Sequence, residues 1–449
     1  MAYRPTIALH LPLVILWAFV GLSTGSLSRA GNLISPDAPE DKADADGLER
    51  GQVILDWNNQ ALQTVRDLSM GSFEAPRVYA MMNVAMFDAV NGIAPVIFDW
   101  ALVRPISNFT VGNRLAAAAA AAHGVLSALF PKRAALYDSM LHKHFSVASQ
   151  RQERLSTGLA WGKKVAGEIL ALMKADLELP SEVQPAGAGP GQFRKDWGSA
   201  AFRRSTPFVV GNLSDLVSPG PPSLTSREYA ADHTEVRLLG DDAYKNKLYD
   251  EIYLFWTTGG GSASISGEFI KIAMVLAVQE KTISSLRRTV HLFTQLALAL
   301  ADASTVAVHD KYTHHFWSPA TAINEADTDG NEATTMDAGW KPRCGSSGGS
   351  PEHISATSAG AAAGGAVLAA EFGDGVAFSF TGDNALAGER SFSSISEAVQ
   401  EAGRSRIYGG INFDFSNRAG LKAGAAVARE VLANSLQYRK GPSSDQDWE

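Results

Sequence analysis

Apolar residues recur at spacings of three and four along most of the chain, which is the period of an amphipathic α-helix. In "APRVYAMMNVAMFDAVNGI" these apolar positions are Val78, Met81, Met82, Ala85, Met86 and Ala89. The segments "LAAAAAAAHGVLSALF" and "QERLSTGLAWGKKVAGEILALMKADL" continue the pattern. Alternating segments bounded by hairpin turns, which would indicate β-strands, are scarce. The pattern therefore predicts a mainly α protein made of two packed helical bundles.

A long connection rich in proline and glycine, residues 179–225, separates the two helical halves. Connections of this length usually carry function rather than serve as linkers alone. In the second half, we expect a long amphipathic helix that ends at Lys311 and is stopped by Pro319. Two further helices are expected, one beginning near Ser355 and one over roughly 418–438.

The N-terminal part of the chain is predicted to be separate from the folded domain. Arg4 precedes an apolar run over residues 7–22, and small residues follow, so residues 1–30 have the layout of a secretory signal. An N-terminal membrane anchor is the alternative. The acidic residues 31–50 read as a linker, and residues 51–449 as one domain with its active-site half at about 226–449. The expected location is the secretory pathway or outside the cell.

Composition excludes several classes of function. The net charge is -8 and the pI is about 5.7, so no basic field exists to attract nucleic acid. No later segment is long and apolar enough to span a membrane. Stable membrane insertion is therefore expected only if the N-terminal segment is retained. The single cysteine, Cys344, excludes an intrachain disulfide and a thiolate zinc site. A small molecule is the expected partner.

Two segments offer groups for binding an anion. In "KYTHHFWSPATAI", Lys311 supplies an ammonium group at a helix end, although a solvated lysine cap is the simpler interpretation. In "GGSPEHISATSAG", a helix start offers backbone N–H groups and a hydroxyl, which suits an anion. An ordinary N-cap by Ser355 explains the same residues.

A third segment, "EAGRSRIYGGINFDF", places Arg404 and Arg406 beside two glycines, Gly409 and Gly410. Arginine binds tetrahedral oxyanions through paired hydrogen bonds, and glycine allows close approach of the backbone. Each segment is a weak signal alone.

Together, in this order, the segments resemble the vanadium-dependent haloperoxidases, which share a fold with type 2 phosphatidic acid phosphatases and bacterial acid phosphatases. That family carries K-x6-R-P, P-S-G-H and S-R-x3-G-x-H. The resemblance extends over nearly the whole chain after the signal, including "VILDWNNQALQTVRD" and "RSFSSISEAVQEAGRSRIYGG". It implies a two-bundle helical fold, and it also suggests homo-oligomers.

The first family motif is only partly matched. Lys311 matches the vanadate-binding lysine and Pro319 the proline, but Ser318 stands where the resemblance would place an arginine.

In the second motif, Ser355 matches the serine that bonds an equatorial oxygen, whereas Thr357 replaces the acid–base histidine. In the third motif, Arg406, Gly409 and Gly410 match. Asn412 occupies the place of the histidine that bonds vanadium, or attacks phosphorus in the phosphatases.

These departures predict changed chemistry. An asparagine amide is a poor metal donor compared with neutral imidazole, so we expect no metal site, and vanadate only if the family chemistry survives. His314, His315 and His353 are considered as replacements, with a polar structural role as the default for each. Lys311, Ser355, Arg406 and Asn412 are the predicted catalytic residues.

Ser318, Thr357, Gly409 and Gly410 are the predicted anion-binding residues, and Tyr312, Phe316, Trp317 and Tyr408 are expected around them. The favoured hypothesis is a vanadium-independent enzyme that rearranges, cyclises or eliminates from a small organic substrate, including phosphorylated ones, by stabilising an oxyanion. The alternatives are a residual vanadium haloperoxidase and a catalytically inactive secreted binding protein.

Overall fold

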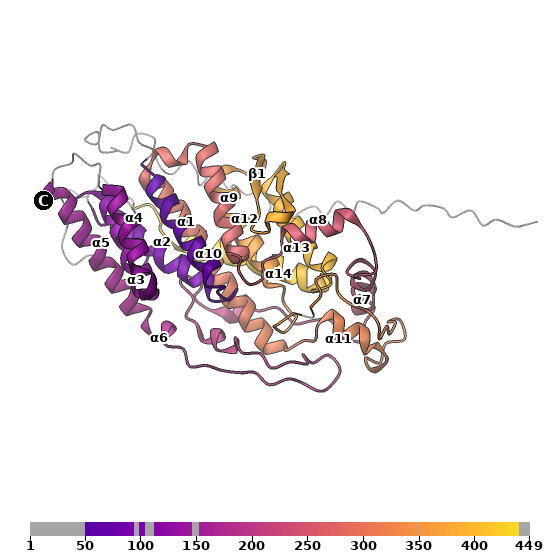
Figure 1. Ribbon diagram of the computed structural model, residues 1–449. Coiled ribbons are helices and arrows are strands. Elements are labelled where there is room, and N and C mark those ends of the chain that lie inside the picture. The colour runs from indigo at the N-terminus through magenta and orange to yellow at the C-terminus, as the bar shows by residue number, and fades with distance from the viewer. Residues whose placement is uncertain (1–49, 94–97, 104–111, 146–151, 347, 440–449) are drawn as a thin grey trace, which may run out of the picture.

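In the computed structural model, the fold is mainly helical, as the sequence pattern predicts (Figure 1). The structure describes residues 50–93, 98–103, 112–145, 152–346 and 348–439. The predicted signal (1–30) and nearly all of the predicted linker (31–50) lie outside these residues, so both stay predictions.

The first bundle comprises α1 (Gln52–Asp67), α2 (Ala75–Asn91), α3 (Arg114–Leu129), α4 (Ala134–Phe145) and α5 (Gln152–Leu172). The alanine-rich α3 packs closely against α5 because α5 has glycines at the contact. A Cβ atom on Gly162 would lie 2.1 Å from the carbonyl oxygen of Ala117, and one on Gly158 would lie 2.4 Å from that of Asn113. The run of small residues thus serves helix packing.

The second bundle contains α7 (Arg227–Leu239), α8 (Lys247–Phe255), α9 (Ser264–Gln279), α10 (Leu286–His314), α11 (Pro319–Asn324), α12 (Ala356–Phe372), α13 (Ile395–Tyr408) and α14 (Asp414–Asn434). Backbones of α12 and α14 approach closely at Gly424, where a Cβ atom would lie 2.0 Å from the carbonyl oxygen of Ala359.

The long helix α10 joins the two bundles. It packs against α2 on one side and against α12 and α14 on the other, and in Figure 1 it lies between the purple helices and the yellow ones. Most of its residues are buried, including Asp302, Asp310 and Lys311. These buried charges need partners from other segments.

The connection over residues 179–225 supplies part of these partners. It contains the short turns η3 (Ala200–Arg204) and η4 (Leu213–Asp215), follows the short helix α6 (Lys174–Leu177), and contacts α10. Backbone N–H groups of Phe208, Val209 and Val210 donate to the Asp302 carboxylate at 2.7–3.0 Å. The connection is therefore held against α10 by buried hydrogen bonds.

Three local features differ from the sequence-based expectation. Pro319 begins α11 as its first residue, where a missing N–H is harmless, rather than only stopping a helix. The segment around Arg404 and Arg406 is the last turn of α13, a helix that the sequence analysis did not name. A small hairpin, β1 (Phe378–Thr381) with β2 (Glu389–Phe392), precedes α13.

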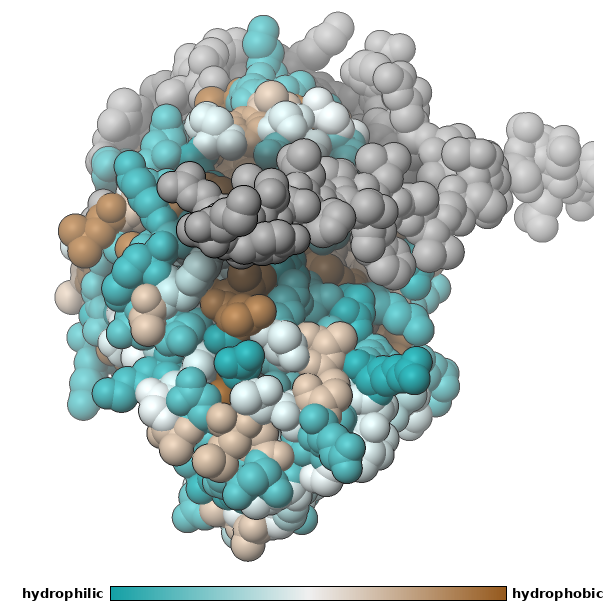
Figure 2. Space-filling model, turned by 90° about the vertical axis from the view of Figure 1, so that its right-hand side faces the viewer, coloured by the Kyte–Doolittle hydropathy of each residue, from teal (hydrophilic) through white to brown (hydrophobic). Residues whose placement is uncertain are grey.

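Contrary to the expectation that no later segment is long and apolar enough to span a membrane, α10 meets these criteria. The bent pair over 114–145 also meets them if it is taken as one span. However, 83% of the apolar window of α10 is buried inside the protein. A core helix passes the same test, so burial explains its composition. On the face shown in Figure 2, hydrophobic residues form small groups within a mainly hydrophilic surface.

Candidate functional site

A cavity of about 330 Å³ lies where α9, α10, α12 and α13 meet the 348–352 loop. Five of the residues predicted to form the site line it, namely Lys311, Ser318, Thr357, Arg406 and Asn412. They come from distant parts of the sequence, as the three motifs require. The cavity wall also includes Phe73 from the first bundle and Trp197 from the long connection, so the second half of the chain does not form it alone.

Lys311 enters the cavity from the last turns of α10 and is 4% exposed. Its ammonium group donates to the carbonyl oxygens of Pro351 and Glu352, the latter at 3.1 Å. An ammonium group has three N–H donors, so one remains for a ligand. Burial lowers the pKa of Lys311, while the nearby Glu352 carboxylate acts to raise it.

Arg406 brings a second cation, from the last turn of α13. Its Nε is buried and has no hydrogen-bond partner in the described part of the chain. Burial lowers the pKa of Arg406, and the groups that act to raise it are Tyr253 and Cys344, neither of which is a carboxylate. The guanidinium is thus available to an anion in the cavity.

Arg404, two residues earlier, points to other partners. It forms ion pairs with Glu235 at 2.7 Å and with Asp414 at 3.2 Å. Of the two arginines in the motif, only Arg406 lines the cavity.

Asn412 does not present a free amide to the cavity. Its Nδ2 donates to the Glu352 carboxylate at 2.8 Å and to the Glu352 carbonyl oxygen at 3.2 Å. The same carboxylate accepts the Phe413 N–H at 2.9 Å and the Ser416 hydroxyl. Asn412 therefore holds Glu352 in the cavity wall.

Glu352 is the main residue that the sequence analysis missed. It lines the cavity, is 3% exposed, and lies beside Lys311. Burial raises the pKa of Glu352, although its hydrogen bonds and Lys311 act to lower it. A carboxyl group whose pKa moves toward neutrality can transfer protons near pH 7. The signal was present in "PEHISA", where an acidic residue directly precedes His353 in a stretch that is otherwise small or apolar.

Ser318 and Thr357 supply hydroxyl groups to the cavity wall. Ser318 also caps α11, because its Oγ accepts the Thr321 N–H at 3.3 Å. Thr357 lies in the first turn of α12. Ser266 of α9 and Ser304 of α10, which the sequence analysis did not select, add two further hydroxyls.

Ser355, Gly409 and Gly410 do not line the cavity. Ser355 is 1% exposed and caps α12, accepting the Ser358 N–H at 3.3 Å. At Gly410, φ is +72°, and a Cβ atom would lie 2.7 Å from the carbonyl oxygen of Gly240. At Gly409, it would lie 2.7 Å from the Tyr253 ring. These glycines allow the turn after α13 to pack tightly.

The aromatic residues expected around the site are placed elsewhere, and that expectation was wrong. Phe316 and Trp317 are buried in a separate core cluster, Tyr312 lies under Arg203, and Tyr408 stacks on Tyr249 with ring centroids 4.1 Å apart. Helical spacing could not show which side of the chain faces the cavity. Phe73 and Trp197 supply the aromatic wall instead.

None of the three histidines considered as replacements lines the cavity. His315 ends α10 in a left-handed conformation, with its ring at the edge of Phe193. His314 and His353 lie close together behind Glu352, with ring centroids 5.3 Å apart. Among the described residues, the cavity has no imidazole in its wall.

Comparison with known proteins supports the two-bundle fold. Residues 291–441 match the family model of the VCPO second helical-bundle domain. No curated protein sequence matches the chain significantly. The matched range contains all three motifs, from Lys311 to Asn412.

Solved structures cover more of the chain. The structure described as "the first bacterial vanadium dependant iodoperoxidase" is similar with a TM-score of 0.74 and 21% identity, over 86% of this chain and 97% of that one. Holo and apo structures of a bacterial vanadium-dependent chloroperoxidase have a TM-score of 0.59 and 16% identity. They match over 81% of this chain and over 92% and 93% of theirs. At these identities the likeness shows the fold.

Proposed function

We propose that the chain, whose residues 291–441 match the VCPO second helical-bundle domain, keeps an oxyanion-binding cavity but uses it without vanadium, as an enzyme acting on a small anionic organic substrate. The observation that carries this proposal is the position of Arg406. Its guanidinium is buried in the cavity wall without a carboxylate partner. A buried cation of this kind is costly unless an anion binds to it.

The residues in the cavity do not fit vanadate as a resident group. The family resemblance assigns the bond to vanadium to an imidazole, whereas Asn412 stands at that position and donates its amide to Glu352. In place of the expected arginine, Ser318 carries no charge and serves as a helix cap. The buried Glu352 carboxylate lies beside Lys311 and offsets part of the positive charge that any oxyanion in the cavity would meet.

The same residues suit a substrate with one anionic group. Lys311 and Arg406 would bind that group, with the hydroxyls of Ser318 and Thr357 as further donors. These donors also stabilise negative charge that develops in an enolate or alkoxide during reaction.

Glu352 would carry the proton, because its raised pKa allows both protonation states near pH 7. Rearrangement, cyclisation and elimination are reactions that need such a set of groups and no redox partner.

A residual haloperoxidase is the second candidate. The observation in its favour is the likeness to a vanadium iodoperoxidase over 86% of this chain. It predicts oxidation of iodide or bromide when orthovanadate and hydrogen peroxide are added. The third candidate, a secreted binding protein, predicts anion binding without turnover of any substrate.

The test of the anion site is calorimetric titration of phosphate into the purified chain and two variants. Arg406→Met should lose binding by at least about tenfold, because a charge-assisted contact contributes about 1.5–3 kcal/mol. Arg404→Met, which removes a nearby charge outside the cavity, should bind like the wild type. Equal affinity in all three proteins would refute the proposal.

A halide-oxidation assay with vanadate and peroxide separates the two enzyme candidates. We expect no activity above that of free vanadate. Halide oxidation that Arg406→Met abolishes would support the second candidate instead. A screen for turnover of organic anions then separates the enzyme from a binding protein, which would give none.

A further inference from the structure

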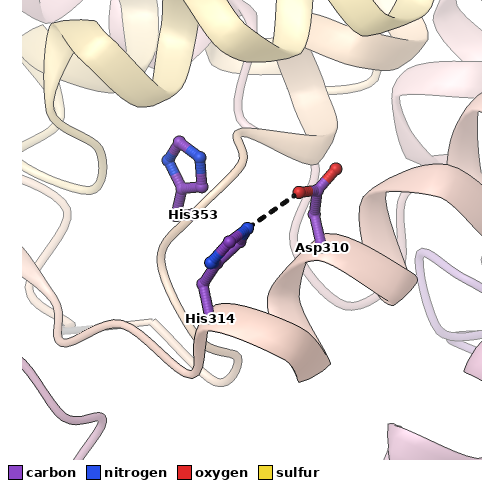
Figure 3. Close-up of side chains that lie close together, drawn as sticks. All are labelled: Asp310, His314 and His353. Atoms are coloured by element: carbon purple, nitrogen blue, oxygen red, sulfur yellow. Dashed lines mark ion pairs between the residues drawn. The ribbon is translucent and has the colours of Figure 1, made fainter. Parts of the chain in front are cut away.

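A cluster of three metal-binding side chains lies behind the cavity. Asp310 and His314 are one turn apart on α10, and His353 lies in the loop before α12, facing them (Figure 3). One ligand atom from each lies within 4.8 Å of the others. Asp310 and His353 are buried, and the His314 side chain is 18% exposed.

The hydrogen bonds around His353 determine which of its nitrogens carries the proton. Its Nδ1 lies 2.9 Å from the Ser416 hydroxyl, which donates its own hydrogen to the Glu352 carboxylate. Ser416 can then only accept from Nδ1–H, so Nε2 has a free electron pair when the ring is neutral.

On the opposite side of the cluster, the Asp310 carboxylate accepts the Ser218 N–H at 3.1 and 3.3 Å, and the Ser218 hydroxyl lies between two further groups. Ser218 Oγ lies 2.8 Å from both Asp310 Oδ1 and His353 Nε2, but a hydroxyl has one hydrogen to donate. His314 Nε2 lies 3.3 Å from Asp310 Oδ1, is buried, and has no hydrogen-bond partner in the described structure. One carboxylate oxygen and two imidazole nitrogens therefore lie within one small volume.

We propose that Asp310, His314 and His353 bind a divalent metal ion of the zinc type, with the Ser218 hydroxyl at the fourth position. Two imidazoles and a carboxylate are a common ligand set for zinc. Zinc bonds of about 2.0–2.1 Å place tetrahedral ligands about 3.3 Å apart, which is the separation of Asp310 Oδ1 and His314 Nε2. Small side-chain rotations would bring in the remaining ligands.

The surroundings support this assignment. A metal-binding histidine usually donates its second N–H to an oxygen acceptor, and here His353 donates to Ser416, which is fixed by Glu352. The ion would also neutralise Asp310, a fully buried carboxylate. It would connect α10, the long connection at Ser218 and the loop that carries Glu352.

This site is separate from the anion cavity. None of Asp310, His314 and His353 lines the cavity, and the proposal does not depend on what the cavity binds. Its effect on the cavity would be to fix the loop over 350–353, whose carbonyl groups accept hydrogen bonds from Lys311.

The test uses the full-length chain without an affinity tag, freed of metals with a chelator. Zn²⁺ is titrated by calorimetry at pH 7, and Co²⁺ is added separately while the visible absorption spectrum is recorded. We expect one Zn²⁺ per chain and the strong visible bands of four-coordinate Co²⁺. His314→Gln, at a partly exposed position, should weaken Zn²⁺ binding by at least about tenfold.

Two variants serve as controls. His315→Gln removes the neighbouring imidazole, and Glu235→Gln removes a carboxylate from the other acidic group, formed with Asp232 and Asp414. Both should bind Zn²⁺ like the wild type. Absence of stoichiometric binding to the wild type would overturn the proposal, whatever the variants do. So would equal binding by wild type and His314→Gln, which would leave His314 as a proton-bearing partner of Asp310.

Discussion

The side-chain amide of Asn412 donates to the carboxylate of Glu352 at 2.8 Å, within the wall of the cavity. This bond connects Asn412, where the third motif departs from the family pattern, with Glu352, which the motifs do not include. It shows a physical use for asparagine at this position. A neutral imidazole has only one N–H, so it could not make both of the bonds that Asn412 Nδ2 makes and still present a free nitrogen to a metal.

Asn412→Asp is expected to destabilise the protein, most strongly at alkaline pH. The new carboxylate would face Glu352 across 2.8 Å, in place of a hydrogen bond. At pH 8 the loss should be about 3 kcal/mol in the free energy of unfolding. Both carboxyls would have a folded-state pKa above the unfolded value, so stability is retained at low pH and lost as pH rises.

Urea denaturation at pH 5 and pH 8 measures this effect. Asn212→Asp is the matched control, since Asn212 is exposed and caps a turn in which aspartate serves equally well. A loss that is the same at both pH values would argue against a carboxylate pair.

Anion affinity should fall as pH rises from mildly acidic values. Burial lowers the pKa of Lys311, so its ammonium form is lost well below the usual range for lysine. The pKa of Glu352 is raised, so negative charge appears in the cavity over a neighbouring range. Both changes weaken anion binding as pH rises. Sulfate is the probe because its charge is constant, and calorimetry between pH 5.5 and 9 gives the profile.

In the Lys311→Met variant, the remaining decrease of sulfate affinity with rising pH should come from Glu352 alone. An affinity for sulfate that stays constant or rises with pH in the wild type would contradict this assignment of charges.

Ser355→Ala should lower stability but leave anion binding almost unchanged. Ser355 caps α12 and does not line the cavity, so its loss should cost about 1 kcal/mol in the free energy of unfolding. Thermal unfolding measures the first effect and sulfate titration the second. A tenfold loss of affinity, about 1.4 kcal/mol, would instead place the serine among the ligands.

Gly410→Ala should destabilise the turn after α13. The φ of +72° disfavours a side chain, and the new Cβ would lie 2.7 Å from the Gly240 carbonyl oxygen. The expected loss is about 1–3 kcal/mol in the free energy of unfolding. Gly375→Ala is the control, because a Cβ atom there would have nothing within 4 Å and the residue is exposed. Equal stability of the two variants would contradict the strain and close packing assigned to Gly410.

The helical fold could be predicted from the sequence because periodicity reports directly on which face of a helix is buried. The motif residues Lys311, Arg406 and Asn412 also lie together, as the family resemblance implies. Glu352 and Phe73 could not be found this way. Their positions depend on how distant segments pack, and on hydrogen bonds such as that from Asn412, which no spacing encodes.

The aromatic residues near Lys311 show a related limit of prediction from the sequence. Phe316 and Trp317 are close to it in sequence, but the left-handed residue His315 turns the chain after α10 and directs them into another core cluster. Proximity in sequence was therefore a poor guide to the cavity wall.

The central claim is that the cavity binds oxyanions through charge and hydrogen bonds, without a bond to vanadium. Parallel calorimetric titrations of orthovanadate and phosphate into the wild type and Arg406→Met test it most directly. The account predicts similar, modest affinities for the two anions in the wild type, and loss of both in the variant. Vanadate binding about a hundredfold or more tighter than phosphate binding, a difference of about 2.7 kcal/mol, would contradict it and indicate a vanadium site formed by other ligands.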